Sequence, residues 1–283
     1  MFLVTAFPLR TKLLPLTKVL WARGIAHQIV EQGDEQQVWL MRAEQVSEAM
    51  HLCEQMMLGE LPEKSQATQD NTFGRVGLLA VLLTTPVTSI VLLITLLLAL
   101  LTGLGSELKY IAPLSFYLLG LSPEPYLISG WQHLLGQPWR LLTPVWLHFG
   151  TLHLVFNCLW WWDLGGRIER QQSGRRLLCL LLAAGLLGNF AQAWQGANLF
   201  GGLSGVIYGL LGYIWLWDQL RTPVFVLPQG IVIFMLAWLV LGFSGVLTAI
   251  GVGNMANMAH LGGLIAGLVL AFIMSMIESS SNK

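Results

Sequence analysis

The sequence predicts a mainly α-helical, polytopic membrane protein, with six transmembrane helices and a small N-terminal α/β domain on the cytoplasmic side. Three observations predict this class. Hydrophobic residues make up 55% of the chain and charged residues only 11%, against roughly 25% charged residues in soluble domains. The stretch Leu177–Trp217 contains no Asp, Glu, Lys or Arg. Seven of the 15 basic and nine of the 15 acidic residues lie within residues 1–75, so a polar region precedes an apolar one.

Residues 1–62 have the pattern of a small α/β domain with the element order βαββα. The expected elements are a strand at Phe2–Ala6, a helix at Thr11–Arg23, a hairpin of Ile25–Val30 with Gln37–Met41, and a helix at Ala43–Leu58. Residues 63–75 are polar and lack periodicity, which predicts a linker to a membrane domain at 76–283. The apolar start of the chain is interrupted at Pro8 and Arg10, so no signal peptide is expected and the N-terminus should stay in the cytoplasm.

The apolar part of the chain offers six candidate spans, since a transmembrane helix needs roughly 20 apolar residues. They are Pro86–Leu104, Pro144–Leu164, Leu177–Trp194, Leu203–Trp217, Gln229–Leu247 and Gly253–Ile277. The segment Gly105–Thr143 between the first two spans is rich in Pro, Gly and aromatic residues. It is too polar to span and too apolar to be a solvated linker, so it is expected to lie at the membrane interface.

Loop charges predict the orientation of these spans, because cytoplasmic loops carry an excess of Lys and Arg. The loops after spans two and four contain the basic residues Arg167, Arg170, Arg175, Arg176 and Arg221. The loops after spans three and five contain none, although Lys109 and Arg140 in the first loop weaken the asymmetry. Both termini are therefore expected in the cytoplasm, and spans two, four and six should start at the outer face.

This orientation places four polar residues at one depth. His153 and Asn157 are expected about three turns into span two. Ser204 starts span four, and His260 lies about two turns into span six. All four then fall in the outer half of the bilayer, where polar side chains are costly and are candidates for function.

A nucleophile and its base are the chemistry that these residues suggest. A free hydroxyl is a poor nucleophile and needs an adjacent base, and His260 is the single ionisable residue in Thr222–Ile277. The acids between residues 141 and 277 are all near cytoplasmic helix ends: Asp163, Glu169 and Asp218. The sequence therefore predicts a Ser204–His260 dyad without a carboxylate. Tyr208, one turn after Ser204, is expected to pack against the His260 ring and orient it.

An oxyanion site and close helix packing complete the prediction. His153 and Asn157 have i, i+4 spacing and point the same way, so with the Ser204 backbone N–H they can bind a developing oxyanion. Small residues allow helix backbones to approach closely. Glycines at this spacing occur in span four and again in span six: Gly201, Gly205, Gly209, Gly263 and Gly267.

Simpler interpretations exist for each of these residues. Ser204 alone can be a packing serine, and His260 alone can be an interhelical hydrogen bond. His153 and Asn157 can join helices, with an average contribution of about 0.6 kcal/mol. A metal site is a weaker alternative, since His148 and His153 are five residues apart and no H-E-x-x-H motif occurs. No metal or other cofactor is expected, and net charge near zero without a basic stripe gives no case for nucleic acid.

Read together, the motifs resemble those of the rhomboid intramembrane serine proteases, in the bacterial subgroup with a cytoplasmic N-terminal domain. The matching segments are Trp139-Arg140, His148-Phe-Gly-Thr-Leu-His153-Leu-Val-Phe-Asn157, Gly202-Leu-Ser204-Gly205 with Tyr208, and Ala259-His260-Leu-Gly-Gly263. They cover residues from about 86 to 277, and the βαββα domain extends the likeness to the whole chain.

The resemblance implies that Ser204 is the nucleophile, His260 the general base, and His153 and Asn157 the oxyanion partners, with Tyr208 stacked beneath His260. It implies structural roles for Arg140 in the first loop and for His148 at the mouth of span two. Phe156 and Trp238 match bulky residues at a lateral gate between spans two and five, although lipid-facing aromatics are an equally simple interpretation.

The same resemblance implies an enzyme of the bacterial cytoplasmic (inner) membrane that cuts transmembrane segments of other proteins within the lipid bilayer, near its outer side. The N-terminal domain is expected to bind a partner, to favour a homodimer, or to tune membrane behaviour. Two other classes stay open: a non-catalytic rhomboid-like chaperone or transporter, and a zinc- or haem-binding membrane protein. The sequence does not name the substrate or the cleavage-site preference.

Overall fold

A computed structural model describes residues 2–40, 43–60, 84–221, 223–225, 227–249 and 255–281. The chain divides into two compact units, Met1–Leu78 and Leu79–Lys283, and each is described by itself. The predicted linker at 63–75 lies outside the described residues.

The N-terminal unit is a three-stranded antiparallel sheet with two helices. Strands β1 (Phe2–Pro8) and β2 (His27–Gln32) both pair with β3 (Glu35–Leu40), in the order β1-β3-β2. Helices α1 (Leu14–Ala22) and α2 (Val46–Met57) complete the predicted βαββα order. The apolar side chains of β3, α1 and α2 form one core, which includes Leu16, Leu20, Val38, Leu40, Leu52 and Cys53.

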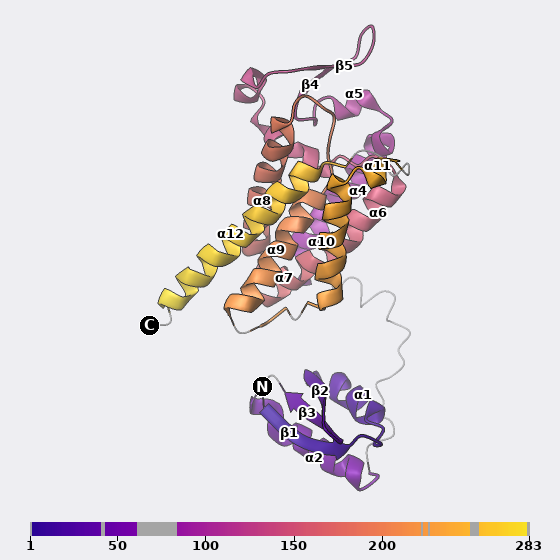
Figure 1. The fold of residues 1–283 in the computed structure, drawn as a ribbon, viewed down its shortest axis with the longest axis vertical. Coiled ribbons are helices and arrows are strands. Elements are labelled where there is room, and N and C mark those ends of the chain that lie inside the picture. Colours follow the sequence, from indigo (N-terminus) through magenta and orange to yellow (C-terminus); the bar gives the residue numbers. More distant parts are fainter. Residues whose placement is uncertain are drawn as a thin grey trace. The chain divides into compact units, whose positions relative to one another are not determined.

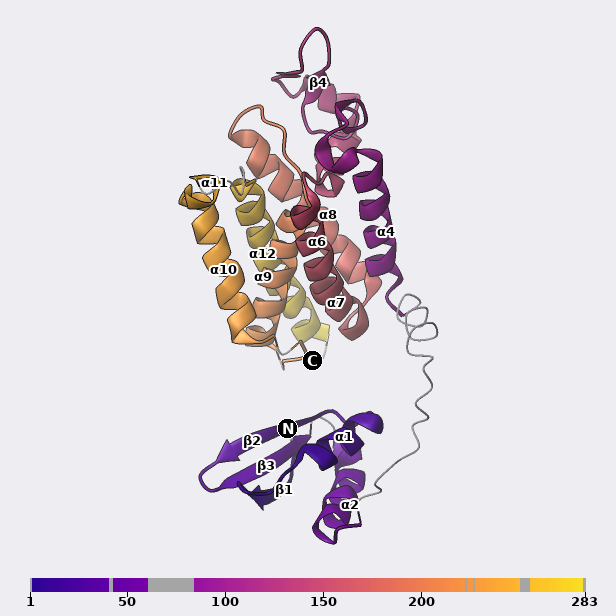
Figure 2. The ribbon, with the colours of Figure 1, turned by 90° about the vertical axis from the view of Figure 1, so that its right-hand side faces the viewer.

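The second unit is a helical bundle, and one helix overlaps each of the six predicted spans. The helices are α4 (Pro86–Leu101), α6 (Thr151–Trp160), α8 (Gly174–Trp194), α9 (Ser204–Leu220), α10 (Gln229–Phe243) and α12 (Asn257–Ser281). A π-helical stretch (Trp161–Gly165) and α7 (Gly166–Gln171) continue α6. Figure 1 shows these helices side by side, and Figure 2 shows α4 and α10 at opposite edges of the bundle.

The number of membrane spans is not settled by these helices. Within the described residues, two helical segments are long and apolar enough to cross a bilayer, Gly174–Trp194 and Asn257–Glu278. Helices α4 and α10 are apolar but shorter, at 16 and 15 residues. The predicted mainly helical architecture with a small strand-containing N-terminal domain is confirmed, and the six-span count stays a prediction.

The start of span two differs from the prediction. Pro144 lies in a 3₁₀ turn (Thr143–Trp146), Leu147 is extended, and Gly150 has φ 103°, so α6 begins only at Thr151. Proline favours the first turn of a helix, but the left-handed glycine six residues later interrupts any helix begun there. His153 therefore lies in the first turn of its helix and Asn157 in the second, rather than three turns in.

The predicted interfacial segment between α4 and α6 is a folded loop at one end of the bundle (Figure 1). It contains α5 (Leu108–Ile111), a two-stranded antiparallel sheet of β4 (Leu118–Gly120) and β5 (Tyr126–Ile128), and several 3₁₀ turns. Its own small core joins loop residues to the end of α8 and the following loop, through Phe116, Tyr117, Ala193 and Phe200.

Helix α9 is the centre of the bundle, and α12 crosses it at backbone contact. A Cβ on Gly263 of α12 would overlap the carbonyl group of Gly205 on α9. One turn further, a Cβ on Gly267 would overlap the carbonyl of Gly209 in the same way. The glycine spacing thus allows the approach predicted from it. Gly201 differs, because it precedes α9 and packs against Pro144 and Leu147.

Candidate active site

Ser204 is the first residue of α9, at the end of a glycine turn. Gly202 has φ 123° and donates its N–H to the carbonyl of Pro144, 3.0 Å away. That positive φ favours glycine over residues with a Cβ. The turn therefore ties the start of α9 to the segment that precedes α6, and so brings Ser204 next to the polar residues of α6.

Ser204 and His260 are in direct contact across the α9–α12 interface. The Ser204 Oγ lies 2.7 Å from the His260 Nε2, and the His260 side chain is 3% exposed. A Cβ on the neighbouring Gly205 would lie 3.0 Å from the carbonyl oxygen of Ala259. The close approach of the two backbones thus allows the His260 imidazole to contact the Ser204 hydroxyl.

Tyr208 lies one turn below Ser204 and supports the imidazole ring. The Tyr208 and His260 ring centroids are 4.9 Å apart, with 34° between the planes. The phenol hydroxyl donates to the carbonyl of Met235 on α10, 2.7 Å away. The sequence anticipated the ring contact, whereas the link from Tyr208 to α10 was not anticipated.

The three acids between residues 141 and 277 make contacts away from Ser204 and His260. Asp163 pairs with Arg167 at 3.0 Å. Glu169 accepts the N–H groups of Val87 and Thr88 at the start of α4, both at 2.8 Å. Asp218 accepts the N–H of Val224 at 2.9 Å. The second ring nitrogen of His260, Nδ1, is buried and has no hydrogen-bond partner among the described residues. Packing on Tyr208, rather than an acid, orients this ring in the described structure.

His153 and Asn157 face the glycine turn before Ser204. The Phe149 N–H donates to the His153 Nδ1 at 3.4 Å, so in the neutral ring Nε2 carries the proton. A Cβ on Gly202 would lie 2.7 Å from the His153 Nε2 and 3.6 Å from the Asn157 Nδ2. Both donors therefore converge on the backbone two residues before the serine, although Asn157 also donates to the carbonyl of His153 at 3.0 Å.

His148 and Arg140 hold the surrounding loops. His148 is fully buried, its Nδ1 lies 3.1 Å from the Trp146 carbonyl, and its ring centroid is 5.0 Å from that of His153. Arg140 is 5% exposed and donates to the carbonyls of Ala112 and Ser115, both at 2.6 Å. Burial lowers the pKa of this guanidinium. Its contacts join distant parts of the first loop, and none of them reaches Ser204.

The two candidate gate residues lie on different helices. Phe156 is on α6 with 56% of its side chain exposed. Trp238 is on α10, is partly buried, and stacks on Phe234 of its own helix with ring centroids 6.1 Å apart. Among the described residues, no ring contact joins Phe156 to Trp238.

Two amide side chains near the site escaped the sequence reasoning. Gln192 of α8 is buried, and its Oε1 accepts the N–H of Met258 at 3.1 Å and that of Ala259 at 3.3 Å. Asn257 donates its Nδ2 to the Gly242 carbonyl at 2.7 Å. The sequence did contain a signal for them, because an amide side chain in a segment without charged residues suggests a polar contact. Their partners are backbone groups, which the sequence does not mark.

Comparison with known proteins identifies the class of this fold and site. The profile of the Rhomboid domain matches residues 135–277, and the profile of the Rhomboid N-terminal domain matches residues 1–67. The chain belongs to the rhomboid family of intramembrane serine proteases.

Curated relatives narrow this to one branch of the family. The chain is 41% identical over 137 residues to the Rhomboid protease GlpG of Pectobacterium atrosepticum, an alignment that spans 48% of each chain. It is 33% identical over 249 residues to the Rhomboid protease GlpG of Yersinia pestis strain Pestoides F, with 83% of each chain covered. A third relative of that name, from Serratia proteamaculans, is 41% identical over 138 residues and 48% of each chain. The sequence-based assignment to the rhomboid family is confirmed.

Proposed function

We propose that Ser204 is the nucleophile and His260 the general base of this intramembrane serine protease, acting as a dyad. The 2.7 Å contact between Ser204 Oγ and His260 Nε2 carries the proposal. The contact lies at the α9–α12 interface, where glycines on both helices allow the backbones to approach closely. Relatives named Rhomboid protease GlpG support the same chemistry.

The reaction follows from this geometry. The Ser204 Oγ attacks the carbonyl carbon of a peptide bond while its proton passes to the His260 Nε2. Collapse of the tetrahedral intermediate breaks the C–N bond, and the same proton leaves with the amine. Water then attacks the acyl-enzyme, gives its proton to His260 and releases the carboxylic acid as the Ser204 Oγ takes a proton back. Each step uses one histidine nitrogen, so a dyad suffices.

The oxyanion of this intermediate is bound by the His153 Nε2–H, the Asn157 amide and the Ser204 backbone N–H. The two side chains converge on Gly202, next to the nucleophile, and fixed donors of this kind contribute most when water is excluded. Asn157→Ala should lower kcat by about 10²–10³-fold with KM little changed. A kcat within twofold of wild type would remove Asn157 from this role.

A fluorophosphonate probe tests the nucleophile directly. Wild-type protein in liposomes should be labelled, and Ser204→Ala should not be. Ser204→Ala and His260→Ala should each cut a transmembrane reporter more slowly by about 10⁴-fold or more. Ser244→Ala is the matched control, because this exposed serine donates to the Leu241 carbonyl and accepts the Val246 N–H, neither of which belongs to the proposed site. Full cleavage by both dyad variants would favour the non-catalytic rhomboid-like alternative, and stoichiometric zinc or haem in purified protein would favour the metal-binding one.

The substrates are transmembrane segments of other proteins, cut near the outer side of the bacterial inner membrane. Such a segment must unfold locally, because a helix hides its peptide bonds in internal hydrogen bonds. Access between α6 and α10, past Phe156 and Trp238, agrees with the exposure of Phe156. Alanine at either position should speed cleavage of a transmembrane reporter and leave a short soluble peptide unaffected. Leu236→Ala, at another exposed residue of α10, is the control. If Phe156→Ala and Trp238→Ala cleave the transmembrane reporter no faster than Leu236→Ala, these residues do not form a gate.

Six spans with both termini in the cytoplasm form the proposed membrane arrangement, with domains at 1–62 and 76–283 joined by a linker at 63–75. The arginines support it, because Arg167 and Arg170 lie in α7, and Arg175 and Arg176 lie in the first turn of α8. Single cysteines introduced between α7 and α8 and after α8 should label from opposite sides of the membrane. Labelling of both from one side would exclude the arrangement.

The N-terminal domain is proposed to favour a homodimer. Leu14 and Trp21 on α1 expose 64% and 60% of their side chains, which is unusual for large apolar residues of a water-facing domain. Light scattering of the full chain should show a dimer that Trp21→Glu weakens. A monomeric wild type would end this part of the proposal.

A further inference from the structure

The first turn of α12 carries His260, and its backbone N–H groups need partners from outside the helix. The first four N–H groups of any helix lack an intrahelical acceptor. In α12, backbone carbonyls accept the N–H groups of Asn257 and His260, which leaves those of the partly buried Met258 and the buried Ala259; an unsatisfied buried donor costs about 1–3 kcal/mol. The chain must therefore supply an acceptor beside the catalytic histidine.

Gln192 supplies that acceptor from a different helix. Its Oε1 accepts the N–H of Met258 at 3.1 Å and the N–H of Ala259 at 3.3 Å. The Gln192 Nε2 in turn donates to the Gln195 Oε1 at 3.3 Å, which holds the amide in this orientation. The Gln192 side chain is 4% exposed. One amide oxygen thus caps the two residues that directly precede His260.

Close packing of α8 on α12 makes this contact possible. A Cβ on Gly188 would lie 2.8 Å from the Ala259 carbonyl oxygen, and a Cβ on Gly262 would lie 3.0 Å from the Leu187 carbonyl oxygen. Glycines therefore let both helix backbones approach on either side of His260. Gln192, one turn beyond Gly188, reaches the end of α12 from that position.

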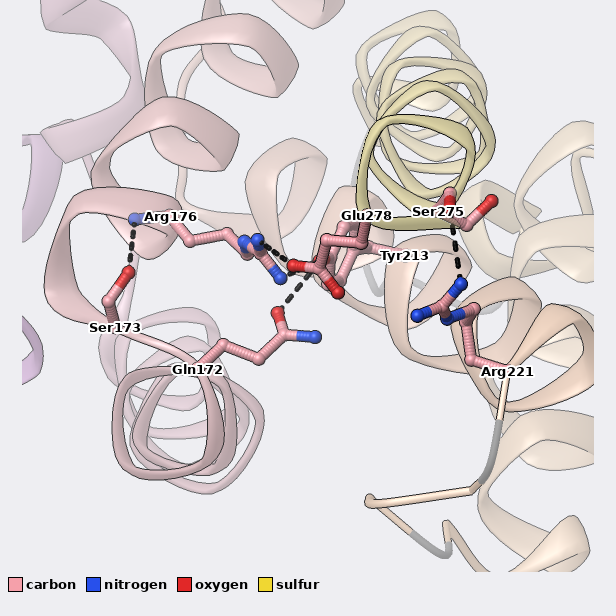
Figure 3. A network of polar contacts seen from close by, with 7 residues as sticks. All are labelled: Gln172, Ser173, Arg176, Tyr213, Arg221, Ser275 and Glu278. Atoms are coloured by element: carbon pink, nitrogen blue, oxygen red, sulfur yellow. Dashed lines mark hydrogen bonds and ion pairs between the residues drawn. The ribbon is translucent and has the colours of Figure 1, made fainter. Parts of the chain in front are cut away.

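The opposite ends of the same two helices are also joined (Figure 3). Arg176, at the start of α8, donates to Glu278 of α12 at 2.5 Å and to the hydroxyl of Tyr213 on α9 at 3.4 Å. Its guanidinium also lies 5.0 Å from the Trp217 ring centroid. Helix α8 thus clamps α12 at two points, about 24 Å apart along α8 at 1.5 Å per residue. The Gln192 end adjoins the dyad, and the Arg176 end does not.

From this arrangement we infer that Gln192 is a positioning residue, which caps α12 from α8 and thereby sets the position of His260 relative to Ser204. The inference rests on the proposed Ser204–His260 dyad. Without the amide oxygen, two buried N–H groups lose their acceptor and the first turn of α12 is free to shift. A misplacement of about 1 Å between reacting groups costs about 10²-fold in rate. The serine hydroxyl itself is untouched by the change.

Four variants of the full-length protein in liposomes test this role. Gln192→Met keeps the side-chain length and removes the acceptor, whereas Gln192→Glu keeps an acceptor oxygen. Gln192→Asn keeps the amide but withdraws it by one methylene, and serves if the methionine variant does not fold. Arg176→Met releases the distant end of the same clamp and is the matched control. The measurements are the rate of fluorophosphonate labelling, kcat and KM for a transmembrane reporter, and Tm.

Gln192→Met and Gln192→Asn should slow labelling and lower kcat by about 10–100-fold, with KM within about twofold. Gln192→Glu should return both rates to within about threefold of wild type. Arg176→Met should lower Tm while the labelling rate of the folded protein stays at the wild-type value. Wild-type labelling rates in Gln192→Met and Gln192→Asn, or equal slowing by Arg176→Met, would overturn the inference. Failure of wild type itself to be labelled at Ser204 would instead refute the proposed dyad.

Discussion

Helix α9 and helix α10 are built differently, although both are apolar and both contact the site. Eleven of the 17 residues of α9 are buried, against three of the 15 residues of α10. Helix α9 meets α12 through glycine backbones at two successive turns. Helix α10 instead exposes large apolar side chains such as Ile233 and Val240, and two side chains bond to its backbone: Tyr208 to Met235 and Asn257 to Gly242.

We propose that this difference reflects two roles: α9 holds the proposed dyad in place, and α10 lies beside the proposed access path for substrates. The dyad needs its two residues held to within a fraction of an ångström, and backbone contact through glycine leaves little room for movement. Helix α10 buries only Met235, Leu239 and Gly242 of its 15 residues, so moving it breaks fewer packing contacts, and each of its two bonds from other helices contributes about 1 kcal/mol. Tyr208 belongs to α9 and Asn257 to α12, so α10 is hydrogen-bonded to the two helices that carry Ser204 and His260.

The largest expected effect comes from filling the α9–α12 contact. Gly263→Val places a branched side chain where the Gly205 carbonyl lies, which should lower the free energy of unfolding by about 3 kcal/mol or more and abolish cleavage. Gly230→Val on α10 is the control, since a Cβ there meets nothing within 4 Å. Thermal unfolding in one detergent compares the two. Equal Tm values would mean that α9 and α12 are not packed more tightly than α10.

A smaller effect is expected from releasing the C-terminal end of α10. The Gly242 carbonyl is among the last four of its helix, which have no intrahelical donor, and the Asn257 amide supplies one. Asn257→Ala should cost about 1–2 kcal/mol locally and raise hydrogen exchange near residue 242 by about tenfold. Cleavage of a transmembrane reporter should quicken while fluorophosphonate labelling stays constant. Slower labelling would show instead that Asn257 serves the dyad.

The smallest effect is expected at Tyr208, which belongs to both regions. Tyr208→Phe keeps the ring beneath His260 and removes the bond to the Met235 carbonyl. That carbonyl lies mid-helix and keeps its intrahelical donor, so the loss should be about 1 kcal/mol or less, seen as faster exchange in the middle of α10. Labelling of Ser204 should change little. Tyr208→Leu, which removes the aromatic support, should slow labelling, and equal rates for both variants would deny the ring its orienting role.

Local patterns predicted much of this protein because they depend on one helix or strand at a time. Apolar runs predicted where the bundle helices lie, and alternation with turn residues predicted the βαββα order. Glycine spacing predicted that α9 and α12 approach closely. The start of α6 was wrong because Pro144 is compatible with a helix start, and the competing conformation at Gly150 depends on packing of the preceding loop.

Contacts between a side chain and a backbone group far away in the chain could not be predicted from the sequence. Gln192 and Asn257 are amides in apolar segments, and nothing in their neighbourhoods indicates which helix end each one caps. The partner of each amide depends on the register of α8, α10 and α12 against one another. That register results from the sum of many packing contacts rather than from any motif.

Residue identity and hydropathy were enough to predict the rhomboid class and the residues of the proposed dyad, because both can be read along the chain without knowing which residues are neighbours in space. Only the packing of the helices places Ser204 Oγ 2.7 Å from His260 Nε2, the Gln192 amide at the first turn of α12, and α10 in hydrogen-bonded contact with α9 and α12. Those features depend on distances between helices, which only the packed chain sets.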